Sequence, residues 1–513
     1  MTSGHFFGGV VLPALKPPPA PVRRLPLPPR LRVPLLQHAG AACEPDVAVG
    51  ERVARYQRLA GVPDDGLGAD VHSPVDGVVV AIERGPVALP GTPMALHVVI
   101  AVDDGARAAW RNGDDDDDRS CRWPALDPWT SPIDALRQRI AEAGLAGLGG
   151  AGFPSAAKLS VGRRLLILNG AECEPVVACD EALLRERAGE VVAGGRLLAR
   201  LCGATRIVLA MERRMESALP AVREALGGDA FPRIGHEAAP VELALLPDRY
   251  PAGGERQLIH AITGDAVPDD GLPRDVGVLV HNVATARAAW RAVAHGEPLV
   301  SRLVTVGGDG VEGAATFECA IGTPMSALGD ALGGWRDDAL VLRAGGPMMG
   351  VAVPDDDVAI GKTTIAVTAW RGGATAPRPC IRCGDCASAC PSRLQPQLIH
   401  ARLQGGDAAG AEALGLRACI ECGACDAVCP SAIPLTAGFV AARNRARQAL
   451  HQRAQADAAK QRFERRIERL QRDADEAATA QAQRVRRASG AAAAALAKAR
   501  SKRDGAGGDG GDA

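Results

Sequence analysis

The chain has 513 residues, enough for several domains with separate cores, and 47% of its residues are hydrophobic. Its 59 lysines and arginines nearly balance its 60 aspartates and glutamates, and aromatic residues make up only 3%, so no nucleic-acid surface built on base stacking is expected. We also expect neither a signal peptide nor a membrane span, and the cysteines scattered outside the C-terminal motifs indicate a reducing, cytoplasmic compartment.

The chain begins with a proline-rich stretch, residues 1–33, which predicts an extended arm without helix or sheet bonding. Residues 34–105 contain short β-like runs separated by glycines, and this pattern resembles the barrel-sandwich fold of lipoyl and biotinyl domains. Those domains carry a modified lysine where this chain has Val75, Asp76 and Gly77. We therefore predict a structural platform and not a swinging arm.

Residues 106–130 form an acidic linker that contains the run Asp114–Asp118. A calcium site is one interpretation of this run. Adjacent aspartates cannot all point at one ion, however, and the spacing of an EF-hand is absent. A solvated loop is the better interpretation.

Residues 131–298 predict an α/β domain with a mostly parallel sheet, because helical stretches at 133–145 and 181–201 alternate with short apolar runs at 164–170, 206–211 and 276–283. Near its start lies a glycine loop followed by Phe153, Pro154 and Lys158. The loop glycines are Gly147, Gly149, Gly150 and Gly152. They let backbone N–H groups approach a phosphate or a flat ring, but the run is neither a P-loop nor a dinucleotide fingerprint, and alone it fits an ordinary turn equally well.

Residues 299–370 return to short strands and predict a small domain of the β-grasp (SLBB-like) type, whereas residues 371–436 contain two cysteine motifs separated by a helical stretch. Each motif reads C-x2-C-x2-C-x3-C-P, in which three cysteines hold one [4Fe-4S] cluster and the fourth reaches the neighbouring cluster. One predicted ligand set is Cys380, Cys383, Cys386 and Cys429, and the other is Cys419, Cys422, Cys425 and Cys390. A pair of zinc sites is the alternative, but it does not explain the duplicated spacing.

Residues 437–513 form a tail rich in alanine and arginine, with 17 Lys and Arg against 6 Asp and Glu between Arg443 and Arg503. The tail is therefore a basic arm on an acidic body. Phe463, Ile467 and Leu470 give one brief apolar stripe. We favour a solvated helix or disorder, with a short coiled coil or partner-docking helix as the alternative.

Three further segments accompany the glycine loop and the cysteine motifs: LILNGAECEPVVACDE at 166–181, RYPAGGERQLIHAITG at 249–264 and VLVHNVATA at 278–286. Over residues 34–436 the chain resembles RnfC proteins of the Rnf electron transport complex. Its α/β core is similar, more distantly, to the NADH-binding flavoprotein of respiratory complex I. The resemblance implies a multidomain α/β protein with a non-covalent FMN, NADH as substrate and two [4Fe-4S] clusters.

The resemblance also implies the residues of the nucleotide site. The glycine loop matches the loop that lines the FMN and NADH pocket, to which Phe153 supplies a ring and Lys158 a cation. Asn169 matches the asparagine of the flavin motif, and Glu174 a glutamate that faces the nicotinamide nucleotide.

Two more segments of this implied site come from later in the chain. Tyr250, Gly253 and Glu255 belong to a second flavin-side segment. Asn282 and Thr285 match a third, which approaches the flavin phosphate and ribityl chain. No side chain is required as a catalytic acid or base, because the two cofactors carry the chemistry.

Three functions compete for this sequence. The first is an NADH-oxidising electron-input subunit, held peripherally at the cytoplasmic face of a bacterial inner membrane by the integral and iron–sulfur partners RnfA, RnfB, RnfD, RnfE and RnfG of an Rnf-type complex. The second is a soluble FMN and iron–sulfur reductase, such as a cobalamin reductase. The third is a non-catalytic electron-transfer protein that has lost nucleotide binding. The proline arm and basic tail favour the first, and the intact glycine loop argues against the third.

Overall fold

The computed structural model describes residues 5–64, 66–112, 123–150, 152–159, 162–227, 239–269, 271–336, 340–373 and 376–504, and the run Asp114–Asp118 lies outside them. The chain divides into two compact units, Met1–Phe439 and Val440–Ala513. None of the helices within the described ranges is both long and apolar enough to cross a membrane.

Two small antiparallel sheets form the first part of the larger unit. Their strand orders are β2-β8-β7-β4 and β3-β5-β6. The turn that leads into β7 is fixed by the fold, since Val75 is buried and the Asp76 carboxylate accepts the N–H of Arg55 at 2.8 Å. The elements here are β2 (Arg30–Pro34), β3 (Glu44–Pro45), β4 (Arg52–Val53), β5 (Arg58–Gly61), β6 (Val71–His72), β7 (Gly77–Pro86), β8 (Met94–Val102) and α1 (Asp104–Asn112).

The N-terminal arm corrects one prediction, because part of it does join sheets. Strand β1 (Arg23–Arg24) pairs with β14 (Ala315–Ala320), and β2 pairs with β8. Both are edge strands, with a ladder partner on one side only, and that is where proline-rich segments are tolerated. The start of the arm packs elsewhere: Val10 and Tyr250 exchange backbone hydrogen bonds of 2.8 Å, and Gly9 donates to Ala389.

The predicted α/β core is confirmed as a fully parallel four-stranded sheet of order β11-β10-β9-β12. Strand β11 was not anticipated, and with it the strands run third, second, first, fourth across the sheet. The core elements are α2 (Ile133–Glu142), α3 (Ser155–Lys158), β9 (Leu165–Asn169), α4 (Cys179–Cys202), β10 (Arg206–Glu212), α5 (Leu219–Gly227), β11 (Val241–Leu246), α6 (Glu255–Thr263), η2 (Pro273–Val276), β12 (Val278–Asn282) and α7 (Val283–Ala294).

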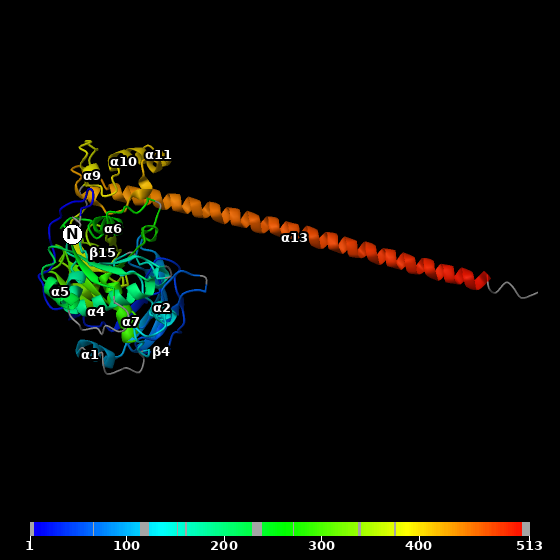
Figure 1. Cartoon of the computed structure of the whole chain (residues 1–513), viewed down its shortest axis with the longest axis horizontal. Helices are drawn as coiled ribbons and strands as arrows, with labels where there is room; N and C mark the ends of the chain where they lie inside the picture. Colours follow the sequence, from blue (N-terminus) through cyan, green and yellow to red (C-terminus); the bar gives the residue numbers. More distant parts are fainter. Residues whose placement is uncertain are drawn as a thin grey trace, which may run out of the picture. The chain divides into compact units, whose positions relative to one another are not determined.

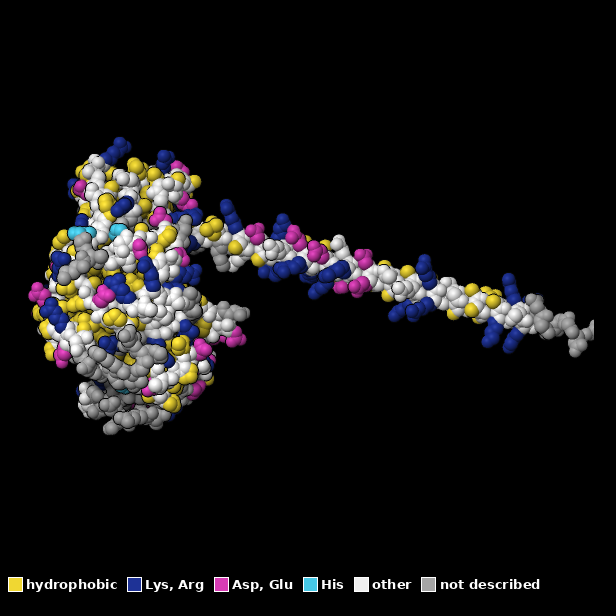
Figure 2. Space-filling view, viewed as in Figure 1, with side chains coloured by type: hydrophobic (Ala, Val, Ile, Leu, Met, Phe, Trp, Pro, Cys, Tyr) yellow, Lys and Arg dark blue, Asp and Glu magenta, His cyan; other side chains and the backbone are white. Residues whose placement is uncertain are grey.

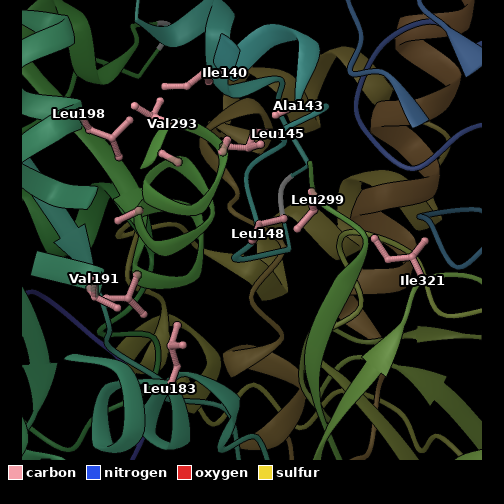
Figure 3. Packing of buried hydrophobic residues seen from close by; sticks show 14 of the residues in the cluster. Ile140, Ala143, Leu145, Leu148, Leu183, Val191, Leu198, Val293, Leu299 and Ile321 are labelled. Carbon is pink, nitrogen blue, oxygen red and sulfur yellow. The ribbon is translucent and has the colours of Figure 1, made fainter. Parts of the chain in front are cut away.

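Helices cover both faces of this sheet, because alternate strand residues point to opposite sides. Leu166 and Leu168 of β9 pack with α2, α4, α5 and α7, whereas Leu165 and Ile167 pack with α6. Leu148 of the glycine loop belongs to the first of these clusters and is 1% exposed. Figure 3 shows it in the same packed region as side chains of α2, α4 and α7. The loop is therefore anchored by an apolar side chain at its centre.

A six-stranded mixed sheet of order β1-β14-β13-β17-β15-β16 follows. Strands β13 and β17 are parallel neighbours, and β14 and β15 run antiparallel to them. Helix α8 lies in the chain between β14 and β15. The elements are β13 (Ser301–Gly307), β14 (Ala315–Ala320), α8 (Ser326–Asp330), β15 (Leu340–Ala344), β16 (Val351–Ala352) and β17 (Ala366–Arg371).

The cysteine-rich part consists of short helices, as the sequence predicts. They are α9 (Asp385–Ala389), α10 (Pro396–Gln404), α11 (Ala408–Ala413), η3 (Leu416–Ala418) and α12 (Ala424–Ala427). The tail is one helix, α13 (Leu435–Asp504), of 70 residues (Figure 1). Of the interpretations left open for the tail, the structure therefore selects a helix over disorder.

Candidate functional site

Two asparagines lie side by side where the parallel sheet reverses its strand order. Asn169 ends β9, Asn282 ends β12, and the two residues are direct partners in the ladder. The helix that follows β9 leads to one side of the sheet and the connection that precedes β12 returns from the other, so the carboxyl ends of these two strands form the topological switch point of the sheet. Ligands of open α/β sheets bind at such a point.

The glycine loop lies against this edge. The N–H of Gly147 donates to the carbonyl of Phe153 at 2.8 Å, and a Cβ placed on Gly149 would lie 3.2 Å from the Asn282 Cβ. Gly150 has a φ of +101° and no heavy atom within 4 Å of a Cβ placed on it. The loop backbone therefore presents an open face at Gly150 and a tight contact at Gly149.

Residues from four other segments hold the loop in place. The Leu148 N–H donates to Thr285 Oγ1 at 3.0 Å, and the Leu148 carbonyl accepts from the buried Arg302 guanidinium at 2.8 Å. The Ala39 N–H donates to Gly152 at 2.8 Å, and the Lys362 ammonium donates to Gly144 at 2.8 Å. A loop with this many fixed partners is pre-organised for a ligand.

The remaining predicted residues fall into two groups, of which the first gathers around the same edge of the sheet. Asn169 Nδ2 donates to the Gly253 carbonyl at 2.9 Å. Lys158 Nζ lies 3.7 Å from Glu255 Oε1 and 5.8 Å from the centre of the Phe153 ring. These side chains therefore belong to the candidate site together with the glycine loop.

Glu174 and Tyr250 make their contacts elsewhere. The Glu174 carboxylate accepts the N–H groups of Met348 and Met349 at 2.9 and 2.8 Å. The buried Tyr250 hydroxyl donates to the carbonyl of Cys422 at 2.5 Å. Both residues therefore connect the α/β core to neighbouring domains through contacts that lie outside the glycine loop.

The first predicted cysteine set lines one cavity. Cys380, Cys383, Cys386 and Cys429 surround it together with Gln397 and His400. Cys380 and Cys383 are exposed to solvent. The fourth cysteine of the second motif thus faces the first three cysteines of the first motif.

The second predicted set is more buried. Burial raises the pKa of the Cys422 thiol to about 12, and the neighbouring Cys419 and Cys390 thiols contribute to the rise. Cys425 is buried as well, and its Sγ lies 3.6 Å from Thr436 Oγ1. The thiol of Cys390 therefore lies within electrostatic range of Cys422, a cysteine of the other motif.

The two motifs also share their backbone conformation. Arg382 and Glu421 occupy equivalent positions and have φ values of 58° and 60°. Gly384 and Gly423, two residues further on, have φ values of 88° and 74° and begin α9 and α12. Left-handed residues at matched places therefore turn the two loops in the same way, as the duplicated spacing of the cysteines predicts.

Comparisons with known proteins match three parts of the chain to known domain families. Residues 4–105 match the RnfC barrel sandwich hybrid domain, residues 140–291 the Nuo51 FMN-binding domain, and residues 375–430 the 4Fe-4S dicluster domain. The RnfC relative from the ion-translocating oxidoreductase complex of Rhodobacter capsulatus is 37% identical over 82% of this chain and 78% of its own length. The chain belongs to the RnfC family.

Other RnfC relatives, also from ion-translocating oxidoreductase complexes, are longer than this chain. The Pseudomonas aeruginosa relative is 40% identical over 93% of this chain, and the chain spans 60% of that relative's length. The Cronobacter sakazakii relative is 38% identical over 91% of this chain and 59% of its own length. Among solved structures, an NAD+-reducing [NiFe]-hydrogenase in the H2-reduced state covers 62% of each chain with a TM-score of 0.44 and 22% identity, a likeness too weak to support an assignment.

The residues of this RnfC chain fit the FMN that its domain family binds. The open face of Gly150 leaves room for a flat ring or a phosphate where any side chain would intrude. Helices α6 and α7 both begin at this edge, and the N-cap residue of α6 is Gly254, which provides no side-chain cap. Uncapped N–H groups at a helix start favour an anion.

A carboxyl group that the sequence motifs did not reveal lies beneath this site. Asp180 Oδ2 accepts a hydrogen bond from Asn282 Nδ2 at 2.6 Å. Burial and the neighbouring Glu172 carboxylate raise the pKa of Asp180 to about 7, although Asn282 and Arg302 oppose the shift. Asp180 belongs to the segment singled out at 166–181, but an acidic residue at a helix start looks like a simple cap.

Asp180 predicts a pH-dependent stability. Because its folded pKa of about 7 lies above the ordinary 3.8, its proton stabilises the folded chain fully below about pH 4, and that stabilisation is lost as the pH rises through 7. Asp180→Asn imitates the protonated form. We expect its apparent melting temperature, relative to the parent chain, to increase between pH 4 and 7 and to level off above. Asp134→Asn, at a side chain that is 97% exposed, should give a flat difference, and a flat difference for Asp180→Asn would contradict the assignment.

Proposed function

We propose that this chain is the electron-input component of a membrane-bound Rnf-type complex. It would bind FMN and NADH at the carboxyl edge of the parallel sheet, hold two [4Fe-4S] clusters, and pass electrons between them, while its partners in the complex couple the transfer to ion translocation. The name that the relatives share, which places them in an ion-translocating oxidoreductase complex, supports this proposal. The observation that carries it is the direct junction between the flavin-side segment and a cysteine loop.

That junction consists of one short stretch of chain. Gly253 accepts the hydrogen bond of Asn169 at the edge of the sheet, and three residues earlier Tyr250 donates its hydroxyl proton to Cys422. Cys173, Tyr250, Cys422 and Ala424 are buried together in one cluster, which Met348 adjoins. A buried, water-poor contact between the two sites suits electron transfer, because it fixes their separation. When bound, FMN accepts a hydride from nicotinamide and releases the electrons singly to one-electron acceptors.

The residue roles within the proposal follow the geometry. The glycine loop, Asn169, Gly253, Asn282 and Thr285 would position the flavin. Lys158, Glu255 and Phe153 lie together at the mouth of the site, with the Lys158 and Glu255 side chains 26% and 43% exposed, which suits a nucleotide that enters and leaves. Glu174 would act on the nucleotide only through the loop at Met348 that it holds.

The cysteine roles follow from the same reasoning. We assign Cys380, Cys383, Cys386 and Cys429 to one [4Fe-4S] cluster and Cys419, Cys422, Cys425 and Cys390 to the other. The cavity that the first set lines and the proximity of Cys390 to Cys422 both support the crossed arrangement. Electrons would leave from the first set, whose Cys380 and Cys383 face solvent.

We also assign residues 299–370 to a β-grasp domain of the SLBB type. The central parallel pair β13 and β17, with an antiparallel strand outside each and a helix between the second and third strands, supports this. We propose the remaining domain boundaries as the sequence predicts them.

The partners in the proposed complex determine where the chain lies. They are RnfA, RnfB, RnfD, RnfE and RnfG, which would hold the chain at the cytoplasmic face of the inner membrane.

The proposal predicts that NADH bleaches the flavin of anaerobic protein and then reduces its clusters, followed by flavin absorbance and by electron paramagnetic resonance. Glu255→Gln should raise the NADH concentration for half-maximal rate by about fivefold or more, since it removes a charged partner at the mouth, and should leave the flavin content unchanged.

The matched control for this experiment is Glu242→Gln. Glu242 is also half-exposed and ion-paired, to Arg206, but it lies near the start of β11, at the opposite edge of the sheet. Failure of NADH to bleach the flavin would refute the nucleotide site. A bleached flavin beside clusters that stay oxidised would refute the proposed junction.

A further inference from the structure

The tail helix α13 carries an apolar stripe that none of the described residues covers. Phe463, Ile467, Leu470, Val485 and Leu496 are 65%, 39%, 49%, 62% and 63% exposed. Five turns of an α-helix contain about 18 residues, so positions 18 apart stand directly above one another. Val485 therefore stands above Ile467, and Leu496 above Ala478. We call this line the tail stripe, and alanines and Gln481 fill the positions between its large side chains.

The charged residues avoid the tail stripe. With about 100° of rotation per residue, every lysine, arginine, aspartate and glutamate from Arg462 to Lys502 falls outside the sector of about 100° that the stripe occupies. The rest of the surface of α13 is strongly basic, because 11 Lys and Arg stand against 5 Asp and Glu from Arg462 to Lys502. Figure 2 shows basic side chains along the helix far beyond the last acidic ones.

A two-stranded coiled coil does not fit this stripe well. A left-handed coiled coil keeps apolar residues in a seam that repeats every seven residues. The positions that follow Phe463 at intervals of seven residues include Leu470, Arg484 and Lys498. A coiled coil in this register would place the two charged side chains in its apolar seam. A stripe that stays in line on a straight helix fits a flat surface instead.

We propose that α13 lies on an anionic lipid surface, with the tail stripe against the acyl boundary and the arginines and lysines among the headgroups. A long helix with one apolar line and a basic remainder is the form that binds in the interface of a membrane without crossing it. Charge complementarity selects anionic lipids. Because alanines form much of the stripe, binding is weak, reversible and sensitive to salt. This contact is independent of the flavin and cluster sites.

The test uses the full chain and vesicles of equal parts phosphatidylglycerol and phosphatidylcholine, with the bound fraction measured by flotation. The parent chain should float with these vesicles at low salt, and not with phosphatidylcholine alone. Ile467→Gln combined with Val485→Gln should weaken binding about tenfold or more, since two aliphatic side chains no longer enter the apolar layer. Glutamine is a good helix former, so helix content by circular dichroism should not change.

The matched control is Glu468→Gln combined with Arg486→Gln. These positions are also 18 apart, on the charged side of α13, and the pair keeps the net charge while introducing the same two glutamines. Its binding should stay within about twofold of the parent. Equal binding of the apolar variant and the parent, or equal binding to both kinds of vesicle, would overturn the proposal. So would a parent chain that forms dimers in lipid-free solution, if the apolar variant is monomeric there, because the tail stripe would then pair two copies.

Discussion

Cys429→Ala protein, purified anaerobically, is expected to lose about four of its roughly eight iron atoms, and the cluster that survives should belong to the second motif, in which Cys429 itself lies. The reason is the cavity that Cys429 lines together with Cys380, Cys383 and Cys386. A cubane that loses one of four thiolates at a partly exposed site is no longer held firmly.

Spectra of the variants show which of the two clusters each substitution removes. The electron paramagnetic resonance spectrum of reduced Cys429→Ala should match that of Cys383→Ala and differ from that of Cys422→Ala. Cys390→Ala should instead match Cys422→Ala, since its thiol neighbours Cys422. Cys202→Ala serves as the control, because Cys202 is a buried free cysteine in α4 outside both motifs, and its iron content should equal that of the parent. A Cys429→Ala spectrum that matches Cys422→Ala would mean that each motif holds its own cluster.

Gly150→Val is expected to abolish FMN retention while leaving both clusters in place. Gly150 has a φ of +101° and open space where a side chain would project. A β-branched side chain is strained at such a φ, and it would also fill the face that the flavin needs. The measurement is the ratio of released FMN to protein after gel filtration, with iron content determined on the same sample.

A variant at a second glycine distinguishes the effect of backbone strain from the effect of filling the flavin site. Gly203, the C-cap of α4, has a φ of +72° and likewise no heavy atom within 4 Å of an added Cβ. Gly203→Val thus carries a similar backbone strain at a position away from the carboxyl edge of the sheet. It should retain FMN at the parent level. If both variants lose flavin alike, backbone strain alone explains the loss and Gly150 does not line the pocket.

The features that the sequence predicted well are those set by local spacing. The cysteines of each motif lie within eleven consecutive residues, so the motif alone fixes most of the loop geometry. The alternation of helices and apolar strands likewise predicted β9, β10, β12 and the parallel sheet. The core elements depend on patterns of burial that one segment shows by itself.

The features that escaped prediction depend on contacts between distant segments. Arg302 supports the glycine loop across 154 residues, and the Lys362 ammonium donates to the Gly144 carbonyl across 218 residues. Nothing near either residue in the sequence marks that role, because each acts through a backbone carbonyl, which every residue has. The prediction that the proline-rich arm would make no sheet hydrogen bonds was wrong for a related reason. Its residues pair only because β8 and β14 offer free edges.

The two cysteine loops share a backbone conformation but carry different charges, and this difference affects the midpoint potentials of the two proposed clusters. At equivalent places inside the two motifs the chain puts Arg382 and Glu421. The loops are therefore alike in shape but differ in charge, because Asp385 balances Arg382 in the first motif, whereas the second motif has no basic residue. Asp426 adds a second acidic group 3.6 Å from the Cys425 sulfur. Since a cluster is easier to reduce near positive charge and harder near negative charge, the proposed second-motif cluster should have the lower midpoint potential. An electron that arrives next to Tyr250 would then pass from the cluster of lower midpoint potential to the solvent-facing cluster, whose midpoint potential is higher.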